Sequence, residues 1–326
     1  MRLRTRLGVV LGLVAAVTLP FAPLVSAQQP SGQGLEISPP LIERSVDPGK
    51  SLTLEIQLRN ITKSTLATSG SIEDFVAQGE EGQAKLLLDE DAEPSPFTLR
   101  PWVSSITRLT LGPGELKTTK VTIDVPKDAS PGGHYGVIRF SGVPPELEGT
   151  GVSLSASIGT LVLLNVSGDV VKKASIEELY STQNNEKKGF FEKGPVTLGI
   201  RIKNEGSVHI KPTGTLRVTD TFGREVEVLS INPLGGNILP ASIRKFEQTM
   251  EKSTAFGRYT VKADVQYDGK ALNQTVTFWV IPYKTIAIVL GVLLLLAVVL
   301  RKGIKKYNQH IISRAKAAKE DKSDKS

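Results

Sequence analysis

Ser51 to Asn60 reads SLTLEIQLRN, and this stretch decides the fold class. Every second residue from Leu52 to Leu58 is apolar, which is the period of a β-strand with one buried and one exposed face. The preceding Asp47-Pro48-Gly49 is typical of a tight turn, because Pro fixes φ and Gly permits a positive φ. The stretch therefore predicts a half-buried strand that follows a turn.

The second half of the chain repeats this stretch. Leu198 to Asn204 (LGIRIKN) has the same alternation as Leu54 to Asn60 (LEIQLRN), and both end in a basic residue and Asn. Gly-x-Tyr precedes a strand in both halves, at Gly133-His134-Tyr135 and at Gly257-Arg258-Tyr259. Two related immunoglobulin-like domains are the simplest account of both repeats.

Short alternating runs with turn residues between them continue on both sides and predict an all-β chain of two tandem immunoglobulin-like β-sandwich domains. We expect a polar spacer at 28–34, the first domain at 35–174 and the second at 195–280. A linker is expected at 175–194, because 172–194 is the most polar stretch between the strand-rich regions.

The N-terminus predicts a secretory signal peptide over residues 1–27. Arg2, Arg4 and Arg6 precede an apolar run, and small residues follow, so cleavage is expected between Ala27 and Gln28. An uncleaved anchor is the alternative.

Ile281 to Leu300 (IPYKTIAIVLGVLLLLAVVL) predicts one transmembrane helix. About 20 mainly apolar residues span a bilayer core. The run has that length if Lys284 extends its ammonium to the interface, where Trp279 and Tyr283 also belong. Residues 301–326 form a basic tail with nine Lys/Arg against three Asp/Glu, so we expect the tail in the cytoplasm and the rest of the mature chain outside. A buried core helix is the alternative.

The formal charge of +7 comes from the two ends of the chain. Residues 28–284 carry 28 Lys/Arg against 30 Asp/Glu, so the basic character does not predict nucleic-acid binding. The chain has no cysteine, which excludes disulfides, thiolate zinc sites and cysteine nucleophiles.

No motif predicts a catalytic, cofactor or metal site. The histidines are His134, His209 and His310, without a pair at metal-ligand spacing. The insert from Ala77 to Pro96 holds an acidic segment at residues 80–93 and predicts a loop or an irregular hairpin. Its cluster Asp89-Glu90-Asp91 favours a solvated loop, with calcium binding as the alternative.

Phe190 and Phe191 are the candidate contact residues. Two adjacent aromatic side chains in a polar segment are costly to leave in water. Either one ring fills the seam between the domains, or the pair is a patch that contacts a partner.

Short motifs in the first predicted domain carry a resemblance. They are Ile37-Ser38-Pro39-Pro40, Asp47-Pro48-Gly49, Pro96-Phe97, Trp102-Val103, Leu111-x-Pro113-Gly114-Glu115, Ile123-x-Val125-Pro126-Lys127-Asp128-Ala129 and Gly133-x-Tyr135-Gly136-x-Ile138. With them the chain resembles the bacterial WxL-interacting protein family, including its DUF916-type peptidoglycan-binding-like domain. The resemblance implies a membrane-anchored surface protein without catalysis. Its first domain would contact the cell wall, and its second would engage WxL-type partner proteins or host ligands.

Taken together, the sequence predicts a non-enzymatic, single-pass cell-membrane protein with both domains extracellular and no cofactor. The expected partners are cell-wall polymer, surface proteins or both, in an adhesion or scaffold role. The alternative is an immunoglobulin-like assembly chaperone that offers a strand edge to exported surface subunits. A hydrolase would need a clustered acid–base pair, and the sequence nominates none.

Overall fold

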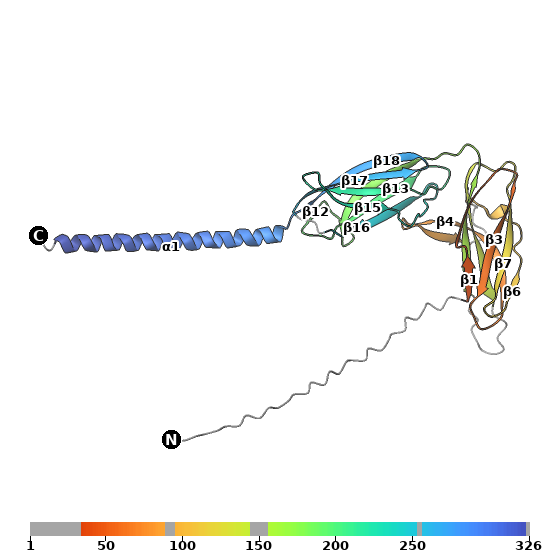
Figure 1. Cartoon of the computed structure of the whole chain (residues 1–326), viewed down its shortest axis with the longest axis horizontal. Coiled ribbons are helices and arrows are strands. Elements are labelled where there is room, and N and C mark those ends of the chain that lie inside the picture. The colour runs from red at the N-terminus through yellow and green to blue at the C-terminus, as the bar shows by residue number, and fades with distance from the viewer. Residues whose placement is uncertain (1–33, 89–94, 144–155, 253–255, 324–326) are drawn as a thin grey trace, which may run out of the picture.

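The chain folds mainly into β-strands and ends in one long helix (Figure 1), which confirms the predicted fold class. The computed structural model describes residues 34–88, 95–143, 156–252 and 256–323. The predicted signal peptide and the cleavage site at Ala27 and Gln28 lie outside the described residues, so both stay predictions.

The first sandwich contains two sheets. Its elements are β1 (Leu35–Ser38), β2 (Leu41–Val46), β3 (Ser51–Asn60), β4 (Leu66–Gln78), β5 (Gln83–Leu87), the 3-10 turn η1 (Arg100–Trp102), β6 (Leu109–Leu111), β7 (Leu116–Asp124), β8 (Gly132–Val143) and β9 (Ala156–Val166). One sheet has the order β1-β3-β7. The other has the order β2-β9-β8-β4-β5, with β6 also paired to β4. The chain changes sheets at Pro39-Pro40, because proline has no N–H to continue a ladder.

The predicted strand at 51–60 is half-buried. Leu54, Ile56 and Leu58 are at most 3% exposed, and they meet Val162 and Leu164 of the opposite sheet in the core of the first sandwich. The two-residue period of the sequence therefore places the apolar face of β3 inward.

The second sandwich also contains two sheets. Its strands are β10 (Ala174–Gln183), β11 (Glu186–Lys187), β12 (Phe190–Phe191), β13 (Thr197–Asn204), β14 (Thr213–Thr219), β15 (Glu225–Ile231), β16 (Ile243–Thr249), β17 (Gly257–Tyr267) and β18 (Lys270–Val280). The sheet orders are β11-β10-β13-β16 and β12-β18-β17-β14-β15.

Residues 175–194, predicted as a linker, instead form β10, β11 and β12 of the second sandwich. β10 pairs with β13 along its length, but the register shifts between Ile176 and Glu178. This bulge breaks the two-residue alternation that identifies a strand in a sequence. The chain between the sandwiches is therefore the shorter segment 167–173.

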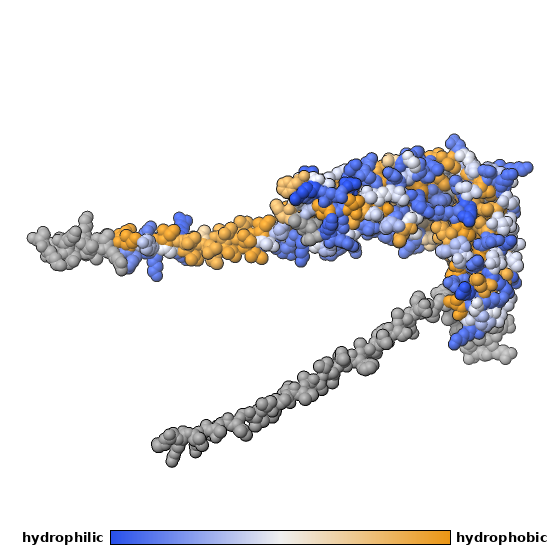
Figure 2. Space-filling model, viewed as in Figure 1, coloured by the Kyte–Doolittle hydropathy of each residue, from blue (hydrophilic) through white to orange (hydrophobic). Residues whose placement is uncertain are grey.

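The C-terminal helix α1 (Tyr283–Ser323) begins two residues after the predicted start of the span. Ile281 still belongs to the sandwich, because its N–H donates to the carbonyl of Phe191 over 2.7 Å. The part of α1 from Tyr283 to Ser313 is long and apolar enough to cross a membrane. Figure 2 shows a mainly hydrophobic stretch of the helix next to the second sandwich.

Candidate functional site: the cleft between the sandwiches

The six-stranded sheet carries apolar side chains on both faces. In β9, Val162 and Leu164 point into the sandwich core, whereas Leu161 and Leu163 point to the opposite face. The outer cluster on that face consists of Phe75, Tyr135, Val137 and Leu163, with Leu86, Phe97, Leu161 and Leu239 packed against it. Leu239 comes from the second sandwich, so the outer cluster belongs to the junction.

The turn between β4 and β5 reaches across to the second sandwich and forms a hairpin clasp (Figure 1). Nε and Nη2 of Arg201 donate to the two carboxylate oxygens of Glu80 over 2.7 and 2.5 Å. Lys245 donates its main-chain N–H to the carbonyl of Glu80 over 2.8 Å, and its ammonium lies 2.9 Å from Glu81. The Arg201 hydrogen bond lowers the pKa of Glu80, so the clasp holds an ionised carboxylate.

A second polar contact joins β2 to the second sandwich. Asn237 donates its side-chain amide to Glu43, and the ammonium of Lys211 lies 3.1 Å from the same carboxylate. Partial burial opposes ionisation of Glu43, but the hydrogen bonds from Asn237 and Lys211 lower its pKa overall.

Tyr135 completes the junction. Its hydroxyl accepts a hydrogen bond from the main-chain N–H of His209 over 2.8 Å, and the two rings meet edge to face at 5.7 Å. The N–H of Gly133 donates to the carbonyl of Ser207 over 2.8 Å. Burial raises the pKa of Tyr135 well above its usual range and lowers the pKa of His209, so both side chains stay neutral near pH 7.

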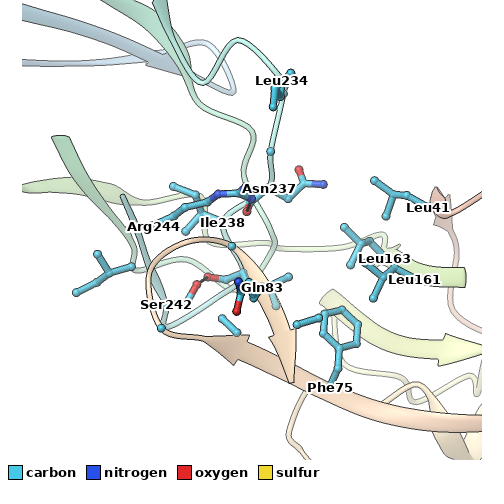
Figure 3. A pocket seen from close by; sticks show the side chains of 18 residues that line it. Leu41, Phe75, Gln83, Leu161, Leu163, Leu234, Asn237, Ile238, Ser242 and Arg244 are labelled. Atoms are coloured by element: carbon cyan, nitrogen blue, oxygen red, sulfur yellow. Dashed lines mark hydrogen bonds between the residues drawn. The ribbon is translucent and has the colours of Figure 1, made fainter. Parts of the chain in front are cut away.

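A cleft of about 230 Å³ lies between these contacts (Figure 3). Leu41, Leu161, Leu163 and Phe75 of the first sandwich line one wall, and residues 234–239 with Ser242, Ile243 and Arg244 of the second sandwich line the other. Gly79, Gly82, Gln83 and Ala84 of the hairpin clasp close one end. The cleft is therefore largely apolar, with Arg244 as its one lining cation among the described residues.

The guanidinium of Arg244 is held close to two glycines. An added Cβ would come within 2.2 Å of it at Gly82 and within 2.5 Å at Gly236. Its Nη1 donates to the carbonyl of Asn237 over 2.8 Å, and no carboxylate among the described residues forms an ion pair with it. Burial lowers the pKa of Arg244, although the group stays charged at neutral pH. Arg244 therefore presents a partly desolvated cation to the cleft.

β2 is an edge strand beside the cleft. It pairs in parallel with β9 on one side, and no other described strand pairs with its opposite side. The main chain of Pro40 and Val46 accepts hydrogen bonds from β9, so alternate residues of β2, beginning with Leu41, direct their N–H and C=O groups outward. An unpaired edge of this kind is a template for another extended segment.

The structure separates the two predicted contact residues. Phe191 is 3% exposed and meets Phe278 edge to face at 5.6 Å, inside the core of the second sandwich. Phe190 is 68% exposed beside Trp279. Neither ring lies in the seam between the sandwiches. β12 pairs with Trp279 and Val280 at the C-terminal end of β18, whereas the segment between the sandwiches contacts Lys270 at the other end of this strand.

The other candidate residues have structural roles. Glu80 and Glu81 of the acidic segment form the hairpin clasp, and residues 89–94 lie outside the described residues. His134 is buried under Trp102, with a ring separation of 4.1 Å. Within the described residues, no group of three His, Cys, Asp or Glu side chains is placed to hold a metal ion.

The sequence motifs do not predict the cleft, although one apolar run in the sequence indicates it. Leu161-Val162-Leu163-Leu164 is a continuous apolar run, which is typical of a strand that is buried on both faces. The second face needs a covering element, and the second sandwich supplies it.

No protein-family model matches the sequence, and no curated protein matches it. The chain is similar to solved structures of fimbrial chaperones. The class 5 fimbriae chaperone CfaA is 14% identical over 74% of this chain and 98% of its own, with a TM-score of 0.37. The structure described as a chaperone–tip adhesin complex vital for activation of CFA/I fimbriae biogenesis is 14% identical over 74% and 97%, with a TM-score of 0.39.

The Escherichia coli chaperone DraB is 14% identical over 75% of this chain and 96% of its own, with a TM-score of 0.35.

Proposed function

We propose that the chain is a membrane-anchored, non-enzymatic binding protein that holds an extended segment of another exported surface protein in the cleft between its sandwiches. This is the role of an assembly chaperone or of a surface scaffold. The observation that carries the proposal is the edge of β2, which no second described strand covers, beside an apolar cleft with Arg244 on its far wall.

An added strand would use every part of this site. Its main chain would pair with the outward N–H and C=O groups of β2, and its alternate side chains would enter the cleft. The volume of 230 Å³ is below the roughly 300–1,000 Å³ of small-molecule pockets, which suits a side chain of a longer segment better than a free ligand. Arg244 would donate to a carbonyl or carboxylate of that segment.

The span and the basic tail support the orientation. With the tail in the cytoplasm, both sandwiches would lie outside the membrane, where exported proteins pass. WxL-type proteins are the exported partners that the sequence resemblance implies. Cell-wall polymer is the other expected ligand, and the apolar lining of the cleft favours a peptide over a polysaccharide.

Site-specific photo-crosslinking of the full chain in its native membrane tests the proposal. A benzophenone side chain replaces Leu41, which is 39% exposed at the cleft. Leu116 is the matched control, since it is 48% exposed on the other sheet of the first sandwich. We expect Leu41 to label exported proteins at segments with alternating apolar residues, and Leu116 to label them weakly.

Arg244→Gln should lower the crosslinking yield at Leu41, whereas Lys262→Gln, on the exposed face of β17, should leave it unchanged. Equal labelling from Leu41 and Leu116, or labelling that Arg244→Gln does not lower, would contradict the proposal.

A further inference from the structure

Exposed aromatic side chains gather at one end of the second sandwich. They are Phe190 (68% exposed), Phe222 (82%), Phe256 (68%), Trp279 (38%) and Tyr283 (59%). Within the described parts of the two sandwiches, every other aromatic side chain is buried or half-buried. We name these five residues the aromatic end.

The strand register brings these residues together from distant parts of the sequence. Phe190 of β12 pairs with Trp279 of β18. Gly257 pairs with Val280, which places the adjacent Phe256 at the same end of the sheet. The turn that holds Phe222 is fixed to β17, because the N–H of Arg258 donates to the hydroxyl of Thr221 over 2.9 Å.

The helix that can span a membrane leaves from this same end. Tyr283 is the first residue of α1, and only residues 281 and 282 separate the helix from β18. The ammonium of Lys284 lies 2.7 Å from Glu192, so the first turn of the helix is tied to the chain that follows β12. If α1 crosses a bilayer, the aromatic end therefore faces the bilayer surface.

The chemistry of this end suits the membrane interface. Aromatic side chains are enriched at the level of the lipid headgroups, where one part of the ring is dry and another is wet. The guanidinium of Arg224 lies 5.3 Å from the ring of Phe222, and the ammonium of Lys284 lies 5.8 Å from the ring of Tyr283. Such long basic side chains keep their charge in water or on lipid phosphate while their stems stay with apolar groups.

We propose that the aromatic end is a membrane-contact surface that rests in the outer leaflet, with Phe222 and Phe256 inserted among the lipid headgroups. The occupant is a phospholipid surface and not a protein partner, because the five residues lie at the end of the sandwich from which the span begins. The contact holds the second sandwich at a fixed tilt. This inference rests on the membrane anchoring and not on what the cleft binds.

The natural absence of cysteine makes the test direct. Phe222→Cys and Phe256→Cys each place one environment-sensitive fluorophore at the aromatic end of the full chain. Leu116→Cys is the matched control, because Leu116 is an apolar residue, 48% exposed, in β7 on the sheet of the first sandwich that does not line the cleft. Each variant is reconstituted in nanodiscs of phosphatidylcholine and phosphatidylglycerol.

We expect labels at positions 222 and 256 to emit at shorter wavelength than the label at 116. Lipids that carry a spin label near the headgroup should quench the labels at 222 and 256 several-fold more strongly than the control label. Aqueous iodide should quench these two labels less than the control label. Labels at 222 and 256 that iodide quenches as strongly as the label at 116 would overturn the proposal, whatever the cleft binds.

Discussion

The asparagine that both sandwiches repeat has the same role in each of them, whereas the repeated tyrosine has two different roles. Asn60 ends β3 and Asn204 ends β13, and both are fully buried. Asn60 donates its amide to carbonyls at Ser64 and Leu111, and Asn204 donates to carbonyls at Val208 and Ile238. Each asparagine therefore fastens the loop that follows its strand.

The repeated tyrosine has two different environments. Tyr259 lies inside the core of the second sandwich, where its ring stacks on Phe278 at 5.2 Å. Tyr135 lies on the outer face of its sheet and contacts His209 of the other sandwich. The asparagine therefore makes the same contacts within both sandwiches, whereas contact with the neighbouring sandwich decides the role of the tyrosine at the junction.

The largest expected effect tests the shared feature. Asn60→Ala and Asn204→Ala each leave buried carbonyls without their donor, which should lower the free energy of unfolding by about 2–4 kcal/mol. Hydrogen exchange of the full chain should show the loss in β1–β9 for Asn60→Ala and in β10–β18 for Asn204→Ala. Asn273→Ala, on the exposed side of β18, is the control. If only one variant is destabilised, the two asparagines are not equivalent.

The next effect tests the difference between the tyrosines. Tyr135→Phe removes the acceptor for the partly buried N–H of His209, which should weaken the junction by about 1–2 kcal/mol. Tyr267→Phe is the control, because its hydroxyl accepts from the N–H of Ala174 within the second sandwich. Spin labels at Leu116→Cys and Phe222→Cys should report a broader distance distribution for Tyr135→Phe alone. An equal broadening in both variants would remove the special role of Tyr135.

A smaller effect is expected at the hairpin clasp. Glu80→Gln keeps the shape of the side chain but removes the charge that Arg201 binds at two oxygens. We expect a loss of about 1 kcal/mol, because the two side chains are only partly buried, at 27% and 32% exposure. The same spin-label distances should broaden slightly, and the difference from the natural chain should shrink in high salt. Glu55→Gln, whose ion pair with Lys120 lies within the first sandwich, should change nothing at the junction.

The smallest effect is a pH dependence. Burial lowers the pKa of His209 in the folded chain, so the neutral ring contributes stability above its unfolded pKa of about 6.5. That contribution should decline as the pH falls below 6.5 towards the folded pKa, with Glu43, Lys211 and Asp268 as the nearby charges. The junction distances should broaden over this range, and His209→Gln should remove the change. A pH response that persists in His209→Gln would assign it to another group.

The sequence predicted the elements whose patterns are local. The alternation at 51–60, the turn before it and the apolar run of the C-terminal helix each depend on neighbours a few residues away. The linker prediction failed at β10, since a bulge interrupts its period and the burial of Tyr180 and Ser181 comes from tertiary packing. The acidic residues Glu80 and Glu81 have no local sign of their partners, which lie more than 100 residues away.

The positions of Phe190 and Phe191 likewise depend on contacts between distant parts of the chain. Its composition indicates that the rings need cover, but only the pairing of β12 with β18 decides that Phe191 enters the core and Phe190 faces outward. Two β-sandwiches and a helix able to span a membrane can be predicted from the amino-acid sequence, because strand and helix periods are local properties. The cleft on the outer face of β9 and the gathering of five scattered aromatic residues at one end depend on the packing of the whole chain. Both arise from strand register and from the contact between sandwiches, which no short stretch encodes.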